Sequence, residues 1–480
     1  MIHQAYLNGY DAAAIHARAA EVIDHAKQLR PEALERYHKH FEEKCAGSKT
    51  TIDAAKQFIP GGVQHNLALN YPFPLNIVKA EGPYLYDVDG NRYIDLLNGG
   101  GVTILGNNYP PIREAVINTI NTTGYLTGLY NEYEKKLAEK IVQYYPSCQK
   151  FRMLGSGTEA VMVALRLARA FTGKDKIVKL KGCYDGWSDH IVYDVRTVNT
   201  GTSFAVGIPA DTLKNTSAVM INDIDALEQR FQENEKDGGT AALIMEPIGQ
   251  DSGGVPVQLG YHQKVRELCD KYGVLLIMDE VVTGFRLGMG GAQATFGVPA
   301  DITVFGKIIA GGFASAGGVG ARDEIMNLVT AGVSHTAGKT IMLGGTLSAN
   351  PVSCVAGYTA ICELERTNAH EKLEAAAEQF AHDLTDLANK YEIPAIITHQ
   401  ASIMQIDVTG FKHIATFPFT KEEIAEKRAI GGRRMNEFAM ALASEGVIVA
   451  AGNKTFLNLQ TIDVLPDALA AYERVFQQFA

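Results

Sequence analysis

The stretch VLLIMDEVVTGFR, residues 274–286, places an acidic pair directly after an apolar run. Asp279 follows five consecutive apolar residues, a pattern typical of a strand that is buried on both faces of a sheet. A carboxylate at the mouth of such a strand needs a cationic partner, because burying it unpaired costs several kcal/mol. We therefore expect Asp279 to meet a positive charge where this strand ends.

The next apolar strand pattern, ITVFG at residues 302–306, is followed by Lys307. Desolvation favours the neutral amine of a lysine that emerges from such a strand into a cleft, and a neutral amine is nucleophilic toward an aldehyde. The alternative is a lysine that merely extends along apolar surface into solvent. Lys307 is thus a candidate nucleophile opposite Asp279.

Around these two strands, strand patterns alternate with helical patterns between about residues 110 and 325. The strand patterns lie at residues 150–154, 177–180, 241–247, 274–280 and 302–306, and the helical ones at 158–170 and 261–272. Such alternation predicts an α/β fold, with a mostly parallel central sheet covered by helices. Ligands of open α/β sheets bind beyond the carboxyl ends of the strands, so the turns at that edge form the candidate site.

Both ends of the chain predict a smaller α+β domain beside this large one. The first residues carry two helical patterns interrupted by Pro31, and a hairpin pattern surrounds Asp89 and Gly90 further on. We divide the chain into a helical N-terminal extension, the N-terminal part of the small domain, the large domain, and the C-terminal part of the small domain, at residues 1–50, 51–105, 106–350 and 351–480.

Composition favours small-molecule chemistry. The 480 residues are 46% hydrophobic and 20% charged, as in ordinary globular proteins. A net charge of −10 argues against a general nucleic-acid binder, which needs clustered Lys and Arg to neutralise phosphates. No apolar run approaches the ~18 residues that a membrane span needs. The six cysteines contain no C-x-x-C pair, which argues against structural zinc and fits a reducing compartment. With no secretory signal pattern at the N-terminus, we expect a cytoplasmic protein without metal, nucleic-acid or membrane partners.

Three further turns follow strand patterns. In GSGTEA, residues 155–160, the first N–H groups of a helix would suit a phosphate, although Ser156 or Thr158 could equally cap that helix. In KGCYDGW, residues 181–187, the ring of Tyr184 could cover a flat cofactor or simply pack the loop. Glu246 ends another apolar strand and faces either a ligand or solvent.

Together these features match the needs of pyridoxal 5′-phosphate (PLP). Its phosphate needs a helix terminus, its ring nitrogen needs an anion in order to stay protonated, and its aldehyde needs a lysine that forms a Schiff base. Each of these turns has an alternative interpretation when taken alone. The agreement of several independent turns on one cofactor favours the PLP site over those alternatives. We therefore expect PLP as the cofactor.

The ordered series PGGV, GSGTEA, CYDGW, MEP, MDEVVTGFR, FGK, GGVG and GGTLSANP resembles the class III (ω-amino) aminotransferases of PLP fold type I. Within that class, IPGGV, DEVVTGFR and GTLSANP look most like the branch containing glutamate-1-semialdehyde 2,1-aminomutase and the β-amino acid aminotransferases. The resemblance covers most of the chain from about residue 55 onward.

The resemblance implies a role for each motif. Lys307 would form the Schiff base, Asp279 would pair with the ring nitrogen, and Tyr184 would stack on the ring. Thr346 would reach the cofactor phosphate of the neighbouring subunit, which implies a homodimer with shared active sites. The predicted cofactor-binding residues are Ser156, Gly157, Thr158, Tyr184, Glu246, Asp279, Val282, Lys307 and Thr346, and the catalytic ones are Lys307 and Asp279.

Some positions depart from better-known members of the class. Val282 replaces a glutamine that many of them carry beside the ring oxygen, and residues 64–67 and 454–460 lack the arginines that customarily grip a substrate carboxylate. His65 and Lys454 remain as tentative substrate-binding residues. A single His or Lys lacks the planar fork of arginine, so it tolerates a carboxylate at a variable distance from the amine.

We therefore expect an aminotransferase that moves an amino group from a β- or ω-amino acid, or a related amine, to a keto acid or aldehyde acceptor. The alternative is an intramolecular aminomutase, racemase or epimerase, which would retain its intermediate under a lid, with residues 198–209 as the candidate. A non-catalytic binding module of this fold would have lost Lys307 or Asp279, and both are present.

Overall fold

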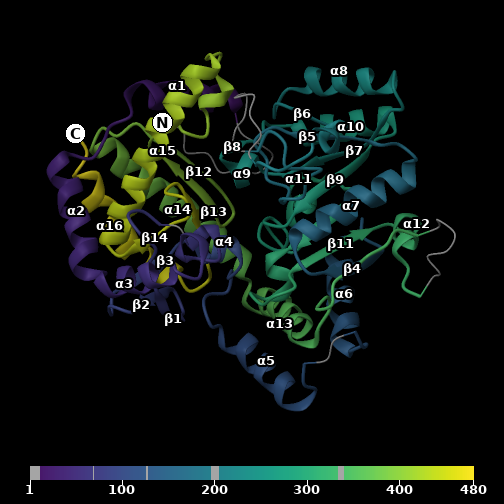
Figure 1. Ribbon diagram of the computed structural model, residues 1–480, viewed down its shortest axis with the longest axis horizontal. Helices are drawn as coiled ribbons and strands as arrows, with labels where there is room; N and C mark the ends of the chain where they lie inside the picture. Colours follow the sequence, from purple (N-terminus) through teal and green to yellow (C-terminus); the bar gives the residue numbers. More distant parts are fainter. Residues whose placement is uncertain (1–10, 69, 126–127, 196–204, 333–339) are drawn as a thin grey trace. The chain divides into compact units, whose positions relative to one another are not determined.

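The structure, a computed structural model, describes residues 11–68, 70–125, 128–195, 205–332 and 340–480 (Figure 1). Contacts between residues divide the chain into two units. The large unit is Pro110–Asn368, and the small unit combines Ala13–Tyr109 with Ala369–Ala480. The small unit is thus built from both ends of the chain and the large unit from its middle.

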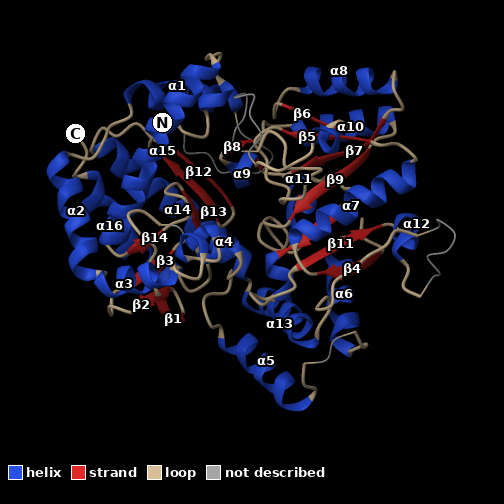
Figure 2. Cartoon of the chain, viewed as in Figure 1, coloured by secondary structure: helices blue, strands red, loops and turns tan. Residues whose placement is uncertain are grey.

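A seven-stranded sheet forms the centre of the large unit, in the order β4-β11-β10-β9-β7-β5-β6 (Figure 2). The strands β10, β9, β7, β5 and β6 run parallel, whereas β11 is antiparallel to both β10 and β4. The predicted α/β fold with a mostly parallel sheet is therefore confirmed. The strand bounds are β4 (Lys150–Leu154), β5 (Lys176–Leu180), β6 (Thr216–Val219), β7 (Thr240–Met245), β9 (Leu275–Glu280), β10 (Ile302–Gly306) and β11 (Gly317–Ala321), with the short β8 (Val255–Pro256) outside the sheet.

Helices connect these strands. They are α5 (Pro110–Thr122), α6 (Glu132–Tyr144), α7 (Gly157–Thr172), α8 (Ile224–Glu235), α9 (Gln250–Gly253), α10 (Tyr261–Tyr272), α11 (Gly291–Phe296), α12 (Asp323–Met326) and α13 (Pro351–Thr367), with the short 3-10 turn η4 (Lys307–Ala310) after β10. Among the described residues, no helix combines the length and apolarity needed to cross a membrane.

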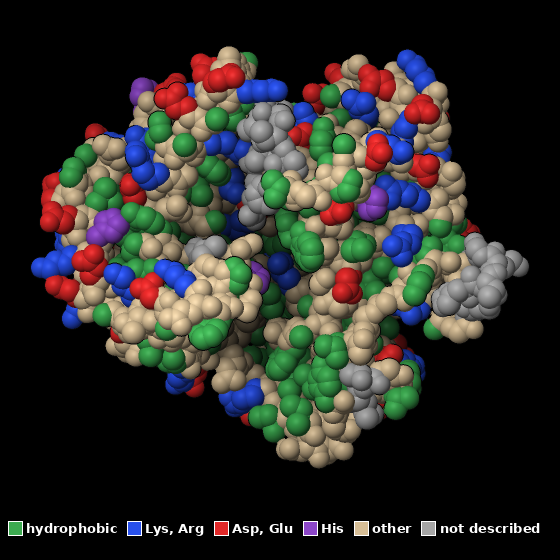
Figure 3. All heavy atoms as spheres, viewed as in Figure 1, with side chains coloured by type: hydrophobic (Ala, Val, Ile, Leu, Met, Phe, Trp, Pro, Cys, Tyr) green, Lys and Arg blue, Asp and Glu red, His purple; other side chains and the backbone are tan. Residues whose placement is uncertain are grey.

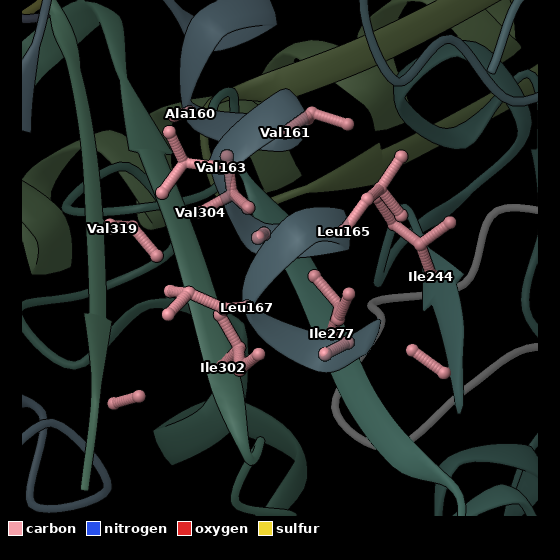
Figure 4. Close-up of a cluster of buried hydrophobic side chains, with 14 of the residues drawn as sticks. Ala160, Val161, Val163, Leu165, Leu167, Ile244, Ile277, Ile302, Val304 and Val319 are labelled. Atoms are coloured by element: carbon pink, nitrogen blue, oxygen red, sulfur yellow. The ribbon is translucent and has the colours of Figure 1, made fainter. Parts of the chain in front are cut away.

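The core of the large unit lies between α7 and the sheet. Apolar side chains recur along α7, and Figure 4 shows Leu167 beside Ile302 of β10, with Leu165 and Ile277 in the same cluster. Each fully buried side chain of this size contributes about 1.5–3 kcal/mol. Because β4 leads directly into α7, this packing holds the first turn of α7 at the carboxyl edge of the sheet.

Two smaller sheets form the small unit, in the orders β1-β2-β3-β14 and β12-β13-β15. The predicted hairpin is confirmed, since β2 (Tyr84–Asp87) pairs antiparallel with β3 (Arg92–Asp95). β14 (Val447–Ile448) pairs with β3, so both chain ends share one sheet. The remaining elements are β1 (Ile77–Glu81), β12 (Ile396–Gln400), β13 (Ile403–Asp407), β15 (Lys454–Phe456), α1 (Ala12–His25), α2 (Pro31–Lys44), α3 (Ala46–Ala55), α4 (Asn98–Gly101), α14 (Ala369–Lys390), α15 (Lys421–Ser444) and α16 (Leu465–Phe476).

The predicted boundaries after residues 50 and 350 do not coincide with this division. The N-terminal helices are an integral part of the small unit, because α2 packs on α15 and the Arg30 N–H donates to the Gln478 carbonyl oxygen at 2.9 Å. Helix α13 belongs to the large unit, because it packs on η4, α5 and α6.

Candidate active site

Asp279 and Lys307 lie on neighbouring strands at the carboxyl edge of the large sheet. Asp279 is near the end of β9, Lys307 directly follows β10, and the strand register pairs Val304 with Asp279. Burial raises the pKa of Asp279 well above its ordinary value, the carboxylates of Asp185 and Glu246 raise it further, and the Lys307 ammonium lowers it. Lys307 is therefore a cationic neighbour of the kind expected for Asp279.

The backbone turns sharply at Lys307. Its φ of +52° lies in the left-handed region, which residues other than glycine rarely adopt. Such strained positions cluster at functional sites, where the surrounding structure holds them in place. The turn opens η4 and leaves the Lys307 side chain half-buried at the edge of the sheet.

The first turn of α7 offers two N–H donors to an anion. Ser156 Oγ accepts the N–H of Glu159 at 3.2 Å, and the Ser156 carbonyl oxygen accepts that of Ala160 at 3.0 Å. Within the described part of the chain, the N–H groups of Gly157 and Thr158 have no acceptor. A Cβ on Gly157 would lie 2.9 Å from Val281 Cγ2, so glycine permits the close packing here. Ser156 thus caps the helix, and Gly157 and Thr158 remain for a phosphate.

Glu246 holds the turn that carries Tyr184. Directly after β7, its carboxylate accepts the N–H groups of Tyr184 at 2.6 Å, Ser252 at 2.8 Å and Asp251 at 3.2 Å. Burial raises the pKa of Glu246 to about 7, and the carboxylates of Asp185 and Asp251 add to the shift. The Tyr184 side chain is exposed, and its contact with the cofactor, like that of Glu246, stays a prediction.

A buried ion pair that the sequence patterns did not predict lies beside this turn. Lys179 Nζ and Asp185 Oδ2 lie 3.0 Å apart, and both side chains are 0% exposed. Lys179 Nζ also donates to the carbonyl oxygens of Cys183 at 2.9 Å and Ile191 at 3.2 Å. The available signals were a lysine inside the apolar strand KIVKL and an aspartate directly after Tyr184.

The remaining cofactor-binding candidates lie in the same unit. Val282 is half-buried in the turn after β9 and has no side-chain group that could replace the hydrogen bond of a glutamine. Thr346 is exposed, and its assignment to a neighbouring subunit's site stays a prediction.

The tentative substrate-binding residues belong to the small unit. His65 is exposed, and its Nδ1 accepts the N–H of Leu67 at 3.0 Å. Lys454 is half-buried on β15. Their roles stay predictions. Of the candidate lid at residues 198–209, residues 198–204 lie outside the described residues.

A family model described as "Aminotransferase class-III" matches residues 67–469 of the chain. The chain belongs to the class III aminotransferases. The match spans both units, so the small unit built from the chain ends is part of the family's own architecture.

Several solved structures share the fold of this class III aminotransferase. An ω-transaminase from Sphaerobacter thermophilus has 28% identity and a TM-score of 0.80, covering 91% of this chain and 99% of its own. A β-phenylalanine aminotransferase from Variovorax paradoxus has 27% identity and a TM-score of 0.79, covering 92% and 96%. A glutamate-1-semialdehyde aminomutase from Pseudomonas aeruginosa PAO1, also solved as a variant with pyridoxamine phosphate (PMP), has 21% identity and a TM-score of 0.79, covering 96% and 98%.

Class III aminotransferases use PLP, and the residues of the large unit fit that cofactor. The two N–H groups at the start of α7 suit its phosphate. The carboxyl groups of Asp185, Glu246 and Asp279 are all buried, and the Asp185 carboxylate raises the pKa of the other two. A cation such as a protonated ring nitrogen would offset this repulsion. A half-buried lysine beside Asp279 suits the aldehyde.

Proposed function

We propose that this class III aminotransferase moves an amino group from a β- or ω-amino acid, or a related amine, to a keto acid or aldehyde acceptor, with Lys307 as the residue that binds the cofactor covalently. The observation that carries the proposal is the placement of Lys307, after β10, beside the buried carboxyl of Asp279 on β9. No metal ligand or second nucleophile is needed for this chemistry.

When bound, PLP supplies an electron sink for the charge that develops on the substrate carbon. Asp279 holds a proton at the ring nitrogen, which keeps that sink effective. The N–H groups of Gly157 and Thr158 bind the phosphate, and the ring of Tyr184 covers the cofactor. The neutral amine of Lys307 would take a proton from the substrate carbon and later return it.

The substrate class rests on the sequence and on one relative. Residues 64–67 and 454–460 lack an arginine fork, which leaves His65 and Lys454 for a carboxylate at a variable distance from the amine. The Variovorax paradoxus enzyme, similar over 92% of this chain, acts on β-phenylalanine according to its name. A β-amino acid is therefore the first donor to test.

A homodimer with shared sites is part of the proposal. Exposed apolar side chains gather on α5 and the segments that follow it, namely Ile117, Ile120, Tyr125, Leu129 and Tyr130. Such a surface on a globular unit favours a second copy of the chain as its partner. We further propose a cytoplasmic location, which the six free cysteines support.

The deciding experiment is a single half-reaction. The PLP-loaded protein is mixed with α-, β- and ω-amino acids of matched length and with a carboxylate-free amine, and conversion of the cofactor to its aminated form is followed by absorbance. We expect the highest kcat/KM for a β- or ω-amino acid, with free keto or aldehyde product detected by mass spectrometry. A preference for L-alanine or L-glutamate over every β- and ω-amine would contradict the proposal.

A substrate whose amino nitrogen is isotopically labelled distinguishes a transferase from an aminomutase. A transferase delivers the labelled nitrogen to an added keto acid. An aminomutase retains it in an isomer of the substrate and releases no keto product.

A further inference from the structure

The ion pair of Lys179 and Asp185 has no part in the function proposed above. Lys179 lies on β5, whose neighbour β7 pairs in turn with β9, the strand of Asp279. Asp185 lies in the turn after β5, between Tyr184 and Gly186. A Cβ on Gly186 would lie 2.9 Å from Thr158 Oγ1, so this turn packs directly on the first turn of α7. The pair is therefore built into the cofactor-binding edge of the sheet.

The two buried carboxylates around Tyr184 have different surroundings. Glu246 accepts three backbone N–H groups, which disperse its charge. Neither oxygen of Asp185 accepts a hydrogen bond of good geometry from the described residues, and the Lys179 ammonium at 3.0 Å is its counter-charge. The negative charge of Asp185 is therefore localised on its carboxylate, in a low-dielectric interior that strengthens its effect on neighbours.

That effect falls on the two acidic residues of the site. After burial, Asp185 is the largest influence that raises the pKa of Asp279, ahead of Glu246, and Lys307 opposes it. Asp185 is also the largest influence after burial that raises the pKa of Glu246, ahead of Asp251. The charged groups that face this cluster thus come from β5, β7, β9 and β10 and the turns that follow them.

We propose that Asp185 is a positioning residue for the cofactor: it places a second negative charge beside Asp279, so that a proton is held more firmly on the ring nitrogen that Asp279 contacts. Lys179 is the counter-ion of Asp185 in the interior, at 3.0 Å, because burying a carboxylate without a cationic partner costs several kcal/mol. This inference rests on the role proposed above for Asp279.

The test is a pH titration of the absorbance of the bound cofactor in Asp185→Asn. Asparagine has the size of aspartate, and its side-chain oxygen can lie beside the Lys179 ammonium as the Asp185 carboxylate does, so the turn keeps its shape. Loss of the negative charge destabilises the protonated cofactor, and we expect the titration midpoint to fall by about one pH unit, the order of shift that a close buried charge produces. kcat should fall about tenfold, in proportion to a one-unit change in proton affinity.

Two variants provide the controls. Asp194→Asn removes another carboxylate influenced by Lys179 and should leave the titration unchanged, because Asp194 is not among the groups acting on Asp279. Asp279→Asn tests the underlying function and should lower kcat by ~10² or more with a large change in the titration. If Asp279→Asn shifts the titration and Asp185→Asn does not, the inference about Asp185 is wrong. If neither shifts it, the proposed role of Asp279 fails as well.

Discussion

Lys307 is the residue on which the proposed chemistry depends most directly. In Lys307→Ala we expect no covalent cofactor after borohydride reduction and a fall in kcat of about 10³ or more, because the nucleophile and the proton-transfer group are lost together. Peptide mapping by mass spectrometry reads the result. Lys181→Ala, in the turn after β5, is the matched control and should keep the label. A reduced cofactor on Lys179, Lys181 or Lys339 in the wild-type protein would refute the assignment.

Glu246 makes the stability of the cofactor-free protein depend on pH. Its pKa is raised from an ordinary value of 4.5 to about 7, so the folded state binds this proton more tightly than the unfolded state does. The stabilisation is complete below about pH 4.5 and is lost as the pH rises to about 7. The free energy of unfolding should fall by up to about 3 kcal/mol over that range.

Urea denaturation at several pH values measures this dependence. In Glu246→Gln the titrating group is gone, so the decline should be shallower, even though the variant starts less stable because an amide accepts fewer N–H groups than a carboxylate. Equal slopes in the two proteins would mean that other groups cause the decline.

At the scale of elements, α13 packs against η4 and so supports the position of Lys307. A Cβ on Gly357 of α13 would overlap the carbonyl oxygen of Ile309 in η4, the 3-10 turn that Lys307 opens. The backbones of α13 and η4 are therefore in direct contact, and η4 can take this position only because Gly357 has no side chain.

We expect Gly357→Ala to displace η4 and to lower both stability and the amount of bound PLP. Alanine gains about 1 kcal/mol in helix propensity, but overlap with a backbone atom costs roughly 1–3 kcal/mol, so the net effect is destabilising. Thr359→Ala in the same helix is the control and should bind PLP normally. Thermal denaturation and cofactor absorbance measure the two effects, and a fully loaded, equally stable Gly357→Ala protein would contradict the packing argument.

At the scale of the whole molecule, the large unit presents an apolar surface. Figure 3 shows hydrophobic side chains gathered around α5 and α13, where Ile117 and Ile120 are 50% and 53% exposed. Side chains of this kind at a surface are typical of an interface between copies of one chain.

If Thr346 serves the partner's site, two inactive variants should complement each other. Lys307→Ala and Thr346→Ala chains are co-expressed with different tags, and the hybrid dimers are purified through both. One of the two sites in each hybrid then carries both native residues, so activity should recover to at most about half of the wild-type value. Hybrids no more active than the mixture of the parents would argue against shared sites, as would a fully active monomer in sedimentation.

Much of the sheet and the central pair of the site are determined by local sequence. An apolar run closed by a turn residue becomes a buried strand wherever it lies in a sheet, and β10 therefore begins and ends where its pattern predicts. β4 and the helix α10 also lie at their predicted residues. Lys307 and Asp279 were recognisable for the same reason, because each follows such a run.

Tertiary structure decided what depends on distant partners. β11 reads GGVGA and carries too few apolar side chains for a strand pattern, yet glycine lets it lie against β4, where a side chain on Gly317 would overlap the backbone of Ser156. Lys179 breaks the apolar pattern of β5 and is buried only because Asp185 and two carbonyl oxygens meet it there. Apolar burial is a property of each segment, whereas a buried charge is stable only with partners that folding brings to it, and these partners are invisible in the local pattern.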